Sequence, residues 1–409
     1  MRAINPKNGE TIANYPDDTD TDIEESLVRA QNDFQEWSRT SFDERADLMT
    51  NAADRLREDI EAHARRMTDE MGKPLEEARG EVEKCAWVCE YFAEQAEEFL
   101  EPTEIETDAS SSYVRYDPLG PILAIMPWNF PYWQVFRFAA PNLMAGNVGL
   151  LSHAANVPGC GEAIADIFEE AGFPSGAFQN LAIDDEQTQE LIGDERVRGV
   201  TLTGSVRAGS AVAAAAGSAI KPTVLELGGS DPFIVLEDAH LGYTVEQAVR
   251  ARTLNSGQSC IAAKRFIVED GIHDEFVEAF EAKLADLEVG DPARKSTDIG
   301  PMAREDLRES LHRQVTETLE AGAALRLGGD VPEGPGYFYP VTLLTDVDAQ
   351  MPAFTDETFG PVAAVTRASD SSHAIELANN SDYGLGASIW TRTGRGEDHV
   401  TDLEAGCVA

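Results

Sequence analysis

Apolar residues three and four positions apart dominate the first hundred residues. Between residues 22 and 100, series such as Leu48, Ala52 and Leu56 recur at helical spacing. Such a series lies on one face of a helix, so the pattern predicts several amphipathic helices before any long strand. An acidic stretch then leads into strand-like residues near Tyr113. We therefore expect residues 102–117 to form a hairpin that leaves the main body.

Short apolar runs alternate with helix-compatible stretches over the rest of the chain. The first set predicts strands at 121–126, 148–151, 199–202 and 224–227, and helices at 133–145, 159–171 and 207–216. The second set predicts strands near 233–236, 265–268 and 361–366, and helices near 244–254, 273–287, 304–321 and 371–379. Repeated strand and helix units predict an α/β fold with an open, doubly wound (Rossmann-like) parallel sheet and a second α/β domain.

The length of the chain also indicates more than one domain. A chain of 409 residues exceeds the size at which a single core stops growing, about 250–300 residues. We assign residues 1–101 and 118–227 to a first domain and residues 228–409 to a second. In such sheets, ligands bind at the carboxyl ends of the strands.

The charge of the chain is strongly negative. It has 74 acidic and 32 basic residues, a net charge of −42, and the acidic residues are spread along its length. This surface repels nucleic acid and anionic membranes. Only seven basic residues are lysines, so we expect a hydrated shell suited to a salt-rich cytoplasm. The alternative is an ordinary acidic protein.

The start of the chain and its cysteines point to the cytoplasm. Met1 leads into a polar segment, without the apolar run that a signal peptide needs, and the longest apolar stretches are too short to span a membrane. The five cysteines show neither a disulfide framework nor the spacing of metal ligands. Cys85 and Cys89 lie on one face of a predicted helix and are expected to be small buried hydrophobes.

Two candidate catalytic residues follow predicted regular elements. Cys260 ends the small polar segment Asn255–Cys260, which can expose a thiol, although a free cysteine is more often simply a buried residue. Glu226 closes an apolar strand and precedes Gly228 and Gly229. A carboxylate at that strand end can act as a general base, although a surface or capping role is equally compatible with the pattern.

Two further segments also follow predicted strands. Asn129 stands within Pro127–Pro131, where a fixed amide can donate to an oxyanion or simply complete a rigid turn. Gly204 and Ser205 lead from a strand into a helix, whose first N–H groups can bind a phosphate. The usual GxGxxG dinucleotide fingerprint is absent from the sequence.

Five motifs together resemble the aldehyde dehydrogenase superfamily. They are PWNFP at 127–131, LTGS at 202–205, LELGG at 225–229, GQSC at 257–260 and ETFGPV at 357–362. Their order matches that family, as does the separation of 34 positions between Glu226 and Cys260 (260 − 226). The resemblance extends from about Ile4 to Ala409.

The resemblance implies a reaction and a role for each domain. Cys260 would attack the aldehyde, Asn129 and the Cys260 N–H would hold the oxyanion, and Glu226 would activate the water that hydrolyses the thioester. The cofactor would be NAD or NADP, bound by the first domain, and the second domain would be catalytic. The implied cofactor contacts are Trp128, Ser152, Gly204, Ser205, Glu357 and Phe359.

Within the superfamily the chain resembles the bacterial type of succinate-semialdehyde dehydrogenase. This closer resemblance rests on Arg137, which stands eight positions after Asn129. The guanidinium of Arg137 can bind the distal carboxylate of a semialdehyde. The alternative for Arg137 is a surface helix position. Alternatives for the whole chain are a dehydrogenase of another small or hydroxylated aldehyde and an inactive dinucleotide-binding remnant.

Several positions depart from the family pattern. A second substrate arginine is replaced by Leu254, with Arg252 two residues too early. Ser152 stands where relatives carry a ribose-binding lysine, and Ala155 where a glutamate selects NAD, so the preference between NAD and NADP stays open. Ala262 replaces the second cysteine of redox-switched relatives.

The resemblance also bears on assembly. Relatives continue beyond the segment that corresponds to residues 406–408 and end in a strand that pairs with a neighbouring subunit, so we expect the C-terminal end to be missing here. The full-length form is expected to be a homo-oligomer, a dimer or tetramer, with the hairpin at 102–117 as its bridge. Without its partner strand the hairpin edge favours association.

Overall fold

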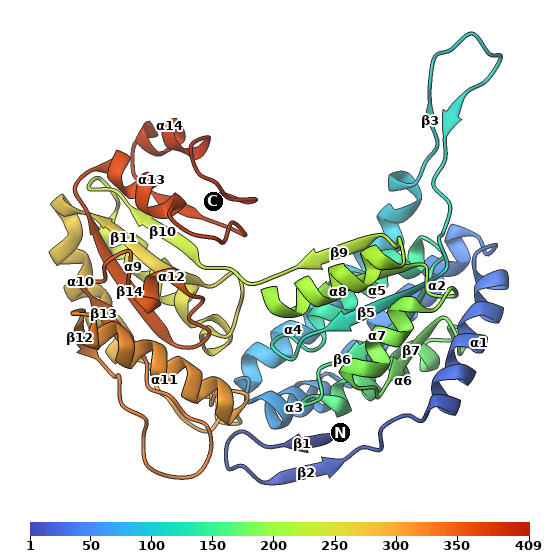
Figure 1. Cartoon of the computed structure of the whole chain (residues 1–409), viewed down its shortest axis with the longest axis horizontal. Helices are drawn as coiled ribbons and strands as arrows, with labels where there is room; N and C mark the ends of the chain where they lie inside the picture. The colour runs from blue at the N-terminus through green and yellow to red at the C-terminus, as the bar shows by residue number, and fades with distance from the viewer. The chain divides into compact units, whose positions relative to one another are not determined.

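The computed structural model describes residues 1–409, except the side chain at position 398. The chain divides into two compact units, drawn in Figure 1. The first unit comprises Met1–Ile4, Thr11–Glu70 and Glu76–Glu226, and the second comprises Asn5–Glu10, Met71–Leu75 and Leu227–Ala409. The sequence assignment of all of 1–101 to one domain therefore misses two short segments. They belong to the second unit because Lys7 pairs with Asp291 at 2.6 Å and the Leu75 N–H donates to the Pro292 carbonyl.

Helices occupy most of the N-terminal region, as the periodicity predicts. They are α1 (Asp20–Trp37), α2 (Phe42–Glu58), α3 (Ile60–Met71) and α4 (Leu75–Phe99), after the short strands β1 (Arg2–Ile4) and β2 (Thr11–Asn14). Thr19 and Ser41 start α1 and α2 as capping boxes, which satisfy N–H groups that the helix leaves unpaired. Ala52 and Leu56 are completely buried, and so are Cys85 and Cys89. The predicted apolar faces are therefore the packed ones.

A five-stranded parallel sheet forms the centre of the first unit, in the order β7-β6-β5-β8-β9. Its strands are β5 (Pro121–Met126), β6 (Val148–His153), β7 (Phe178–Leu181), β8 (Gly199–Thr203) and β9 (Thr223–Glu226). The connecting helices are α5 (Trp133–Met144), α6 (Pro158–Glu170), α7 (Asp185–Gly193) and α8 (Val206–Ser218). β5 and β8 are neighbours although two strands intervene in sequence, so the order reverses between them. A ligand crevice is expected at their carboxyl ends.

The predicted hairpin is present and short. Its strands β3 (Thr103–Glu104) and β4 (Tyr113–Val114) are antiparallel and have two residues each. In Figure 1 it extends away from the helices of the first unit. Tyr113 and Val114 are about half exposed, at 57% and 46%. Its role as an oligomer bridge stays a prediction.

The second unit contains a six-stranded sheet in the order β12-β13-β14-β11-β10-β15. Its strands are β10 (Asp231–Val235), β11 (Ala263–Glu269), β12 (Ala324–Leu327), β13 (Thr342–Thr345), β14 (Val362–Ala368) and β15 (Ser388–Trp390). Its helices are α9 (Leu241–Thr253), η1 (Leu254–Gly257), α10 (Asp270–Ala285), α11 (Glu305–Glu320), α12 (Pro352–Thr355), α13 (Ser371–Asn379), η2 (Gly394–Gly396) and α14 (Glu397–Val400). Only the edge pair β12 and β13 is antiparallel. The two parallel sheets confirm the predicted α/β class.

Phenylalanines of strands and helices form the main core of the second unit. Phe233 and Phe266 from the sheet pack with Phe276 and Phe280 from α10, and all four are essentially inaccessible. This core fixes β10, β11 and β14 side by side and parallel. Their starting ends therefore share one edge of the sheet, where the loops that precede them meet. Across the described residues, every helix is too short or too polar to span a lipid bilayer.

Candidate active site

A buried histidine fixes the loop that carries Asn129, which joins β5 to α5. Asn129 is only 5% exposed. Nδ1 of His153 on β6 lies 3.2 Å from the Met126 carbonyl and 3.0 Å from the Ala154 N–H, and its Nε2 lies 3.0 Å from the Pro131 carbonyl, so the ring contacts both ends of the loop. Burial lowers the pKa of His153 to about 4, which keeps the ring neutral at pH 7. The position of the Asn129 loop is thus set from the neighbouring strand.

A glutamate from α4 caps the helix that follows this loop. The side chain of the N-cap residue Tyr132 makes no capping hydrogen bond; instead, Oε1 of Glu81 accepts from the N–H groups of Tyr132 and Trp133, both at 2.9 Å. Glu81 is 5% exposed, and a negative charge is stabilised at a helix N-terminus. The start of α5, and with it the direction of Arg137, is therefore held rigidly.

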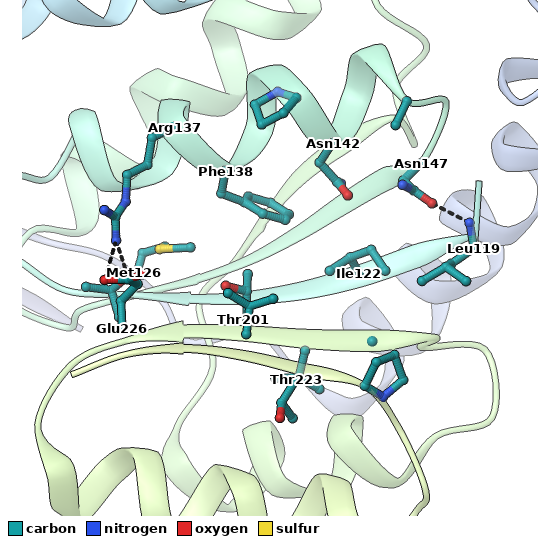
Figure 2. Close-up of a pocket in the computed structure, with 17 residues that line it drawn as sticks. Leu119, Ile122, Met126, Arg137, Phe138, Asn142, Asn147, Thr201, Thr223 and Glu226 are labelled. Atoms are coloured by element: carbon teal, nitrogen blue, oxygen red, sulfur yellow. Dashed lines mark hydrogen bonds and ion pairs between the residues drawn. The ribbon is translucent and has the colours of Figure 1, made fainter. Parts of the chain in front are cut away.

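Arg137 and Glu226 lie together at one end of a cavity of about 560 Å³ in the first unit (Figure 2). Nη2 of Arg137 donates to Oγ1 of Thr203 at 3.2 Å and lies 3.9 Å from Oε2 of Glu226. The side chains of Arg137 and Glu226 are 33% and 43% exposed, so both can be reached by a ligand. Much of the cavity wall is apolar, with Met126 and Phe138 among its residues. Arg137 is therefore a cation at the mouth of a largely apolar space.

The turn from β8 into α8 has the features of an anion site. Oγ of Ser205 accepts from the Ala208 N–H at 3.2 Å and caps this 13-residue helix. The Gly204 N–H donates to the Glu226 carbonyl, which joins the ends of β8 and β9. Ser205 and Val206 are exposed, so a ligand can reach the N–H groups of the first turn. A pyrophosphate fits this donor set.

The other cofactor candidates of the first unit differ in accessibility. Trp128 is half-buried. Ser152 is 7% exposed, and its hydroxyl lies 3.4 Å from that of Thr188. Ala155 is exposed. Ser152 therefore faces a protein hydroxyl, and its contact with a cofactor stays a prediction.

The loop that carries Cys260 is held in an unusual backbone conformation. Asn255, Ser256 and Gly257 have φ values of 55°, 56° and 75°, the left-handed region that costs energy for residues other than glycine. Nη2 of Arg252 donates to the Gly257 carbonyl at 2.6 Å. Arg252 is completely buried, so it supports the loop and is closed to a substrate. Cys260 itself is partly exposed.

Three segments of the second unit converge where β10, β11 and β14 begin. The Gly229 N–H donates to Oε1 of Glu357 at 3.1 Å, and the same oxygen lies 3.8 Å from Nζ of Lys264. A Cβ atom on Gly229 would lie only 2.5 Å from the Cys260 carbonyl oxygen, so this close approach requires glycine. The glycines of LELGG, the GQSC loop and Glu357 therefore form one arrangement, with Phe359 half-buried two residues further on.

Burial shifts the pKa values of Lys264, Glu357 and the nearby Asp231. Desolvation raises the pKa of Glu357, against the opposing effect of Lys264, and raises the pKa of Asp231 to about 6. Desolvation lowers the pKa of Lys264 to about 8, while Glu357 and Asp231 favour its charged form. Shifts of this kind are typical of functional sites, although structural ion pairs also produce them.

The structure places the predicted residues in two groups, one in each unit. Arg137 and Glu226 meet in the first, and Cys260 and Glu357 lie around Lys264 in the second. The sequence reasoning missed Thr203, His153, Glu81 and Lys264, which support these groups. Only Lys264 had a visible signal, because it is one of seven lysines and stands with Arg265 between the apolar residues 261–263 and 266–268.

Comparison with known proteins identifies the family of the chain. The sequence profile of the aldehyde dehydrogenase family matches residues 1–409. A probable succinate-semialdehyde dehydrogenase [NADP(+)] of Synechocystis sp. is 49% identical over 409 residues, covering 100% of this chain and 90% of that protein. Succinate-semialdehyde dehydrogenase [NADP(+)] 1 of Mycobacterium bovis is 49% identical over 395 residues, covering 96% and 86%.

The fold has close structural relatives as well. The crystal structure of succinic semialdehyde dehydrogenase from Streptococcus pyogenes in complex with NADP+ superposes with a TM-score of 0.97 at 36% identity, covering 100% of this chain and 90% of that one. Such coverage confirms the family that the five motifs predict. The chain belongs to the aldehyde dehydrogenase family and is an enzyme.

Proposed function

We propose that this enzyme oxidises succinate semialdehyde, or a close ω-carboxylated aldehyde, to the diacid with NADP or NAD. The observation that supports this substrate is the position of Arg137. Its half-buried guanidinium lies at the end of a largely apolar cavity, beside Thr203 and Glu226. A guanidinium binds a carboxylate through two parallel hydrogen bonds, which an uncharged aldehyde cannot accept. The names of the two curated relatives at 49% identity support the same substrate.

The proposed reaction uses Cys260 as nucleophile. Its thiolate adds to the aldehyde carbon, and the resulting oxyanion is held by the Asn129 amide and the Cys260 N–H. The nicotinamide cofactor would supply the hydride acceptor, and loss of the hydride from the adduct would leave a thioester on Cys260. Glu226 takes a proton from water, the water oxygen attacks the thioester carbonyl, and the acid leaves as the thiolate is restored.

The cofactor contacts follow from the donors that each unit offers. Ser205 and the first turn of α8 would hold the pyrophosphate, with Gly204 and Trp128 beside it, because these N–H groups are accessible and suited to an anion. Glu357 and Phe359 would contact the nicotinamide side, and Ser152 the adenosine ribose. With Ala155 in place of an acidic residue, no carboxylate at that position repels a 2′-phosphate, so we favour NADP.

Replacing Arg137 with alanine should separate charged from uncharged substrates. We expect kcat/KM for succinate semialdehyde to fall about 10- to 100-fold, the effect of losing a charge-assisted hydrogen-bonded pair. For butanal, which has the same chain length and no carboxylate, the change should stay within about threefold. Steady-state kinetics with both aldehydes measures this.

The matched control is Arg55→Ala, which removes an exposed arginine of the same unit that pairs with Glu58. It should leave both aldehydes unaffected. Equal efficiency of the unsubstituted enzyme on the two aldehydes, unchanged by Arg137→Ala, would show that Arg137 binds no substrate carboxylate.

We also propose that the enzyme works in a salt-rich cytoplasm, because its net charge is −42. The thermal unfolding midpoint should rise between low salt and about 1 M KCl, where the Debye length falls to about 3 Å and self-repulsion is screened. Scanning calorimetry would measure the midpoint, with an uncharged osmolyte at matched osmolality as control. A midpoint that does not rise with KCl, or that rises equally with the osmolyte, would contradict the proposal.

A further inference from the structure

Lys264 is the one lysine of the second unit whose ammonium group is enclosed by the loop that carries Cys260. Its side chain is 0% exposed. Nζ donates to the carbonyl oxygens of Ser259 (3.0 Å), Cys260 (2.9 Å) and Ala262 (3.0 Å). An ammonium group has three N–H donors, so these three acceptors use all of them. A neutral amine, with two N–H donors, could donate to only two of the three.

The contact with Ser259 fixes the direction of a neighbouring amide. In a trans peptide the C=O and the following N–H lie in one plane and point in opposite directions, and the described residues contain no cis peptide. The Ser259 carbonyl accepts from Nζ at 3.0 Å and from the Ala262 N–H at 3.2 Å. Because it points at Nζ, the Cys260 N–H points away from Lys264. This is the N–H that the proposed reaction uses for the oxyanion.

We propose that Lys264 is a positioning residue that sets the direction of the Cys260 amide N–H for oxyanion binding. The proposal rests on the proposed function, in which Cys260 is the nucleophile. Lys264 would touch no reacting atom and would act through the Ser259–Cys260 peptide alone. The substrate carbonyl would then bind on the face of this peptide opposite Lys264.

The peptide that follows, Cys260–Ile261, is confined as well. Its carbonyl oxygen accepts from Nζ of Lys264 and lies so close to the backbone of Gly229 that a Cβ atom there would come within 2.5 Å of it. The backbone of Cys260 is therefore held on both sides of its Cα atom, by Lys264 at each of the two peptides.

The charges around Lys264 also keep the ammonium form. Glu357, before β14, and Asp231, on β10, attract it; Arg252, on α9, opposes it. The carboxylate of Glu357 lies 3.8 Å away. Cys260, whose carbonyl accepts from Lys264, is the fourth group that faces it, and its thiolate would attract the ammonium too. With three carbonyl acceptors and two carboxylates, the surroundings favour a compact cation with three donors over a planar guanidinium.

Lys264→Met tests the proposal because it keeps the length of the side chain and removes all three donors. We expect kcat to fall about 100-fold, as when one oxyanion donor is lost, with KM for the aldehyde changed less than about threefold. Alkylation of Cys260 by iodoacetamide develops no oxyanion. Its rate constant at pH 7, where Lys264 is mainly charged, divided by the Cys260 thiolate fraction measured in each protein from ultraviolet absorbance, should therefore stay within about threefold.

The controls separate positioning from general damage. Lys283→Met makes the same change at an exposed position of α10 and should alter neither rate. If Lys264→Met does not fold, Lys264→Gln, which keeps two donors, should fold, with a kcat below that of the unsubstituted enzyme and an unchanged alkylation rate per thiolate. An unchanged kcat in the variant that folds, or a parallel loss of kcat and of the alkylation rate per thiolate, would overturn the proposal. Failure of the proposed function itself would show separately, as activity that survives in Cys260→Ala.

Discussion

Replacing Cys260 with alanine should lower kcat for aldehyde oxidation by at least about 10⁴-fold. Loss of a covalent nucleophile removes the whole two-step pathway, and such losses reach about 10⁶-fold in other enzymes. The fold should survive, because Cys260 is partly exposed and its loop is held by Arg252, Lys264 and the glycines of LELGG. Cofactor affinity should therefore stay within about threefold. Steady-state kinetics and quenching of tryptophan fluorescence by NADP measure the two quantities.

Cys407→Ala is the matched control, since Cys407 is the exposed cysteine of the same unit. It should retain full activity and the same unfolding midpoint. Activity of Cys260→Ala within tenfold of the unsubstituted enzyme would remove Cys260 from the mechanism and leave the protein with a different chemistry.

Replacing Glu226 with glutamine should block the second half of the reaction and spare the first. A general base contributes about 10²- to 10⁴-fold, so steady-state turnover should fall by that range. Addition of the thiolate and hydride transfer do not use the base, so a burst of reduced cofactor, one per active site, should remain. Stopped-flow absorbance at 340 nm resolves the burst from the slow steady state.

The neutral amide keeps the size of Glu226 and removes only its charge and basicity. Glu195→Gln makes the same change at an exposed position of the first unit and should leave burst and turnover intact. The assignment of Glu226 as base fails if turnover is unchanged, or if the burst slows as much as the turnover.

Much of the first unit could be predicted from local patterns. The apolar runs at 121–126 and 199–202 correspond to β5 and β8, and the reversal of strand order between them places Asn129 and Ser205 beside the expected crevice. Elements with a clear apolar period can be predicted from the sequence, because side chains spaced at that period share one face, and the apolar face is the buried one. The reading missed β7, whose four residues Phe178–Leu181 include polar Gln179 and Asn180.

The residues that hold the site in place could not be predicted from local patterns. Glu81 caps α5 from 51 residues upstream, and no local signal links the two. The expectation that ligands bind at the carboxyl ends of strands does not locate the site in the second unit. There, Gly229, Cys260 and Glu357 lie before the strands β10, β11 and β14, at the edge of the sheet where these strands begin. The loop that brings Cys260 to this edge has a left-handed backbone at Asn255 and Ser256. The sequence does not predict this conformation, because neither residue is glycine.

The sequence reasoning noted that Arg252 lies two residues before the position of the second substrate arginine, and the structure shows what it binds instead. Both of its terminal nitrogens donate to backbone carbonyls, of Ala263 at 2.9 Å and of Gly257 at 2.6 Å. Spacing alone cannot distinguish an arginine that binds a ligand from one that holds a loop, because both stand near the nucleophile. Arg137 is thus the substrate arginine of this proposal.

The most direct measurement is mass spectrometry of Glu226→Gln quenched in acid during turnover of succinate semialdehyde with NADP. The central claim predicts one succinyl group on the peptide that contains Cys260, formed only with cofactor present and removed by hydroxylamine, as a thioester is. Quenched samples that turn over and yet carry no acyl group on Cys260, or carry it on another residue, would contradict the claim.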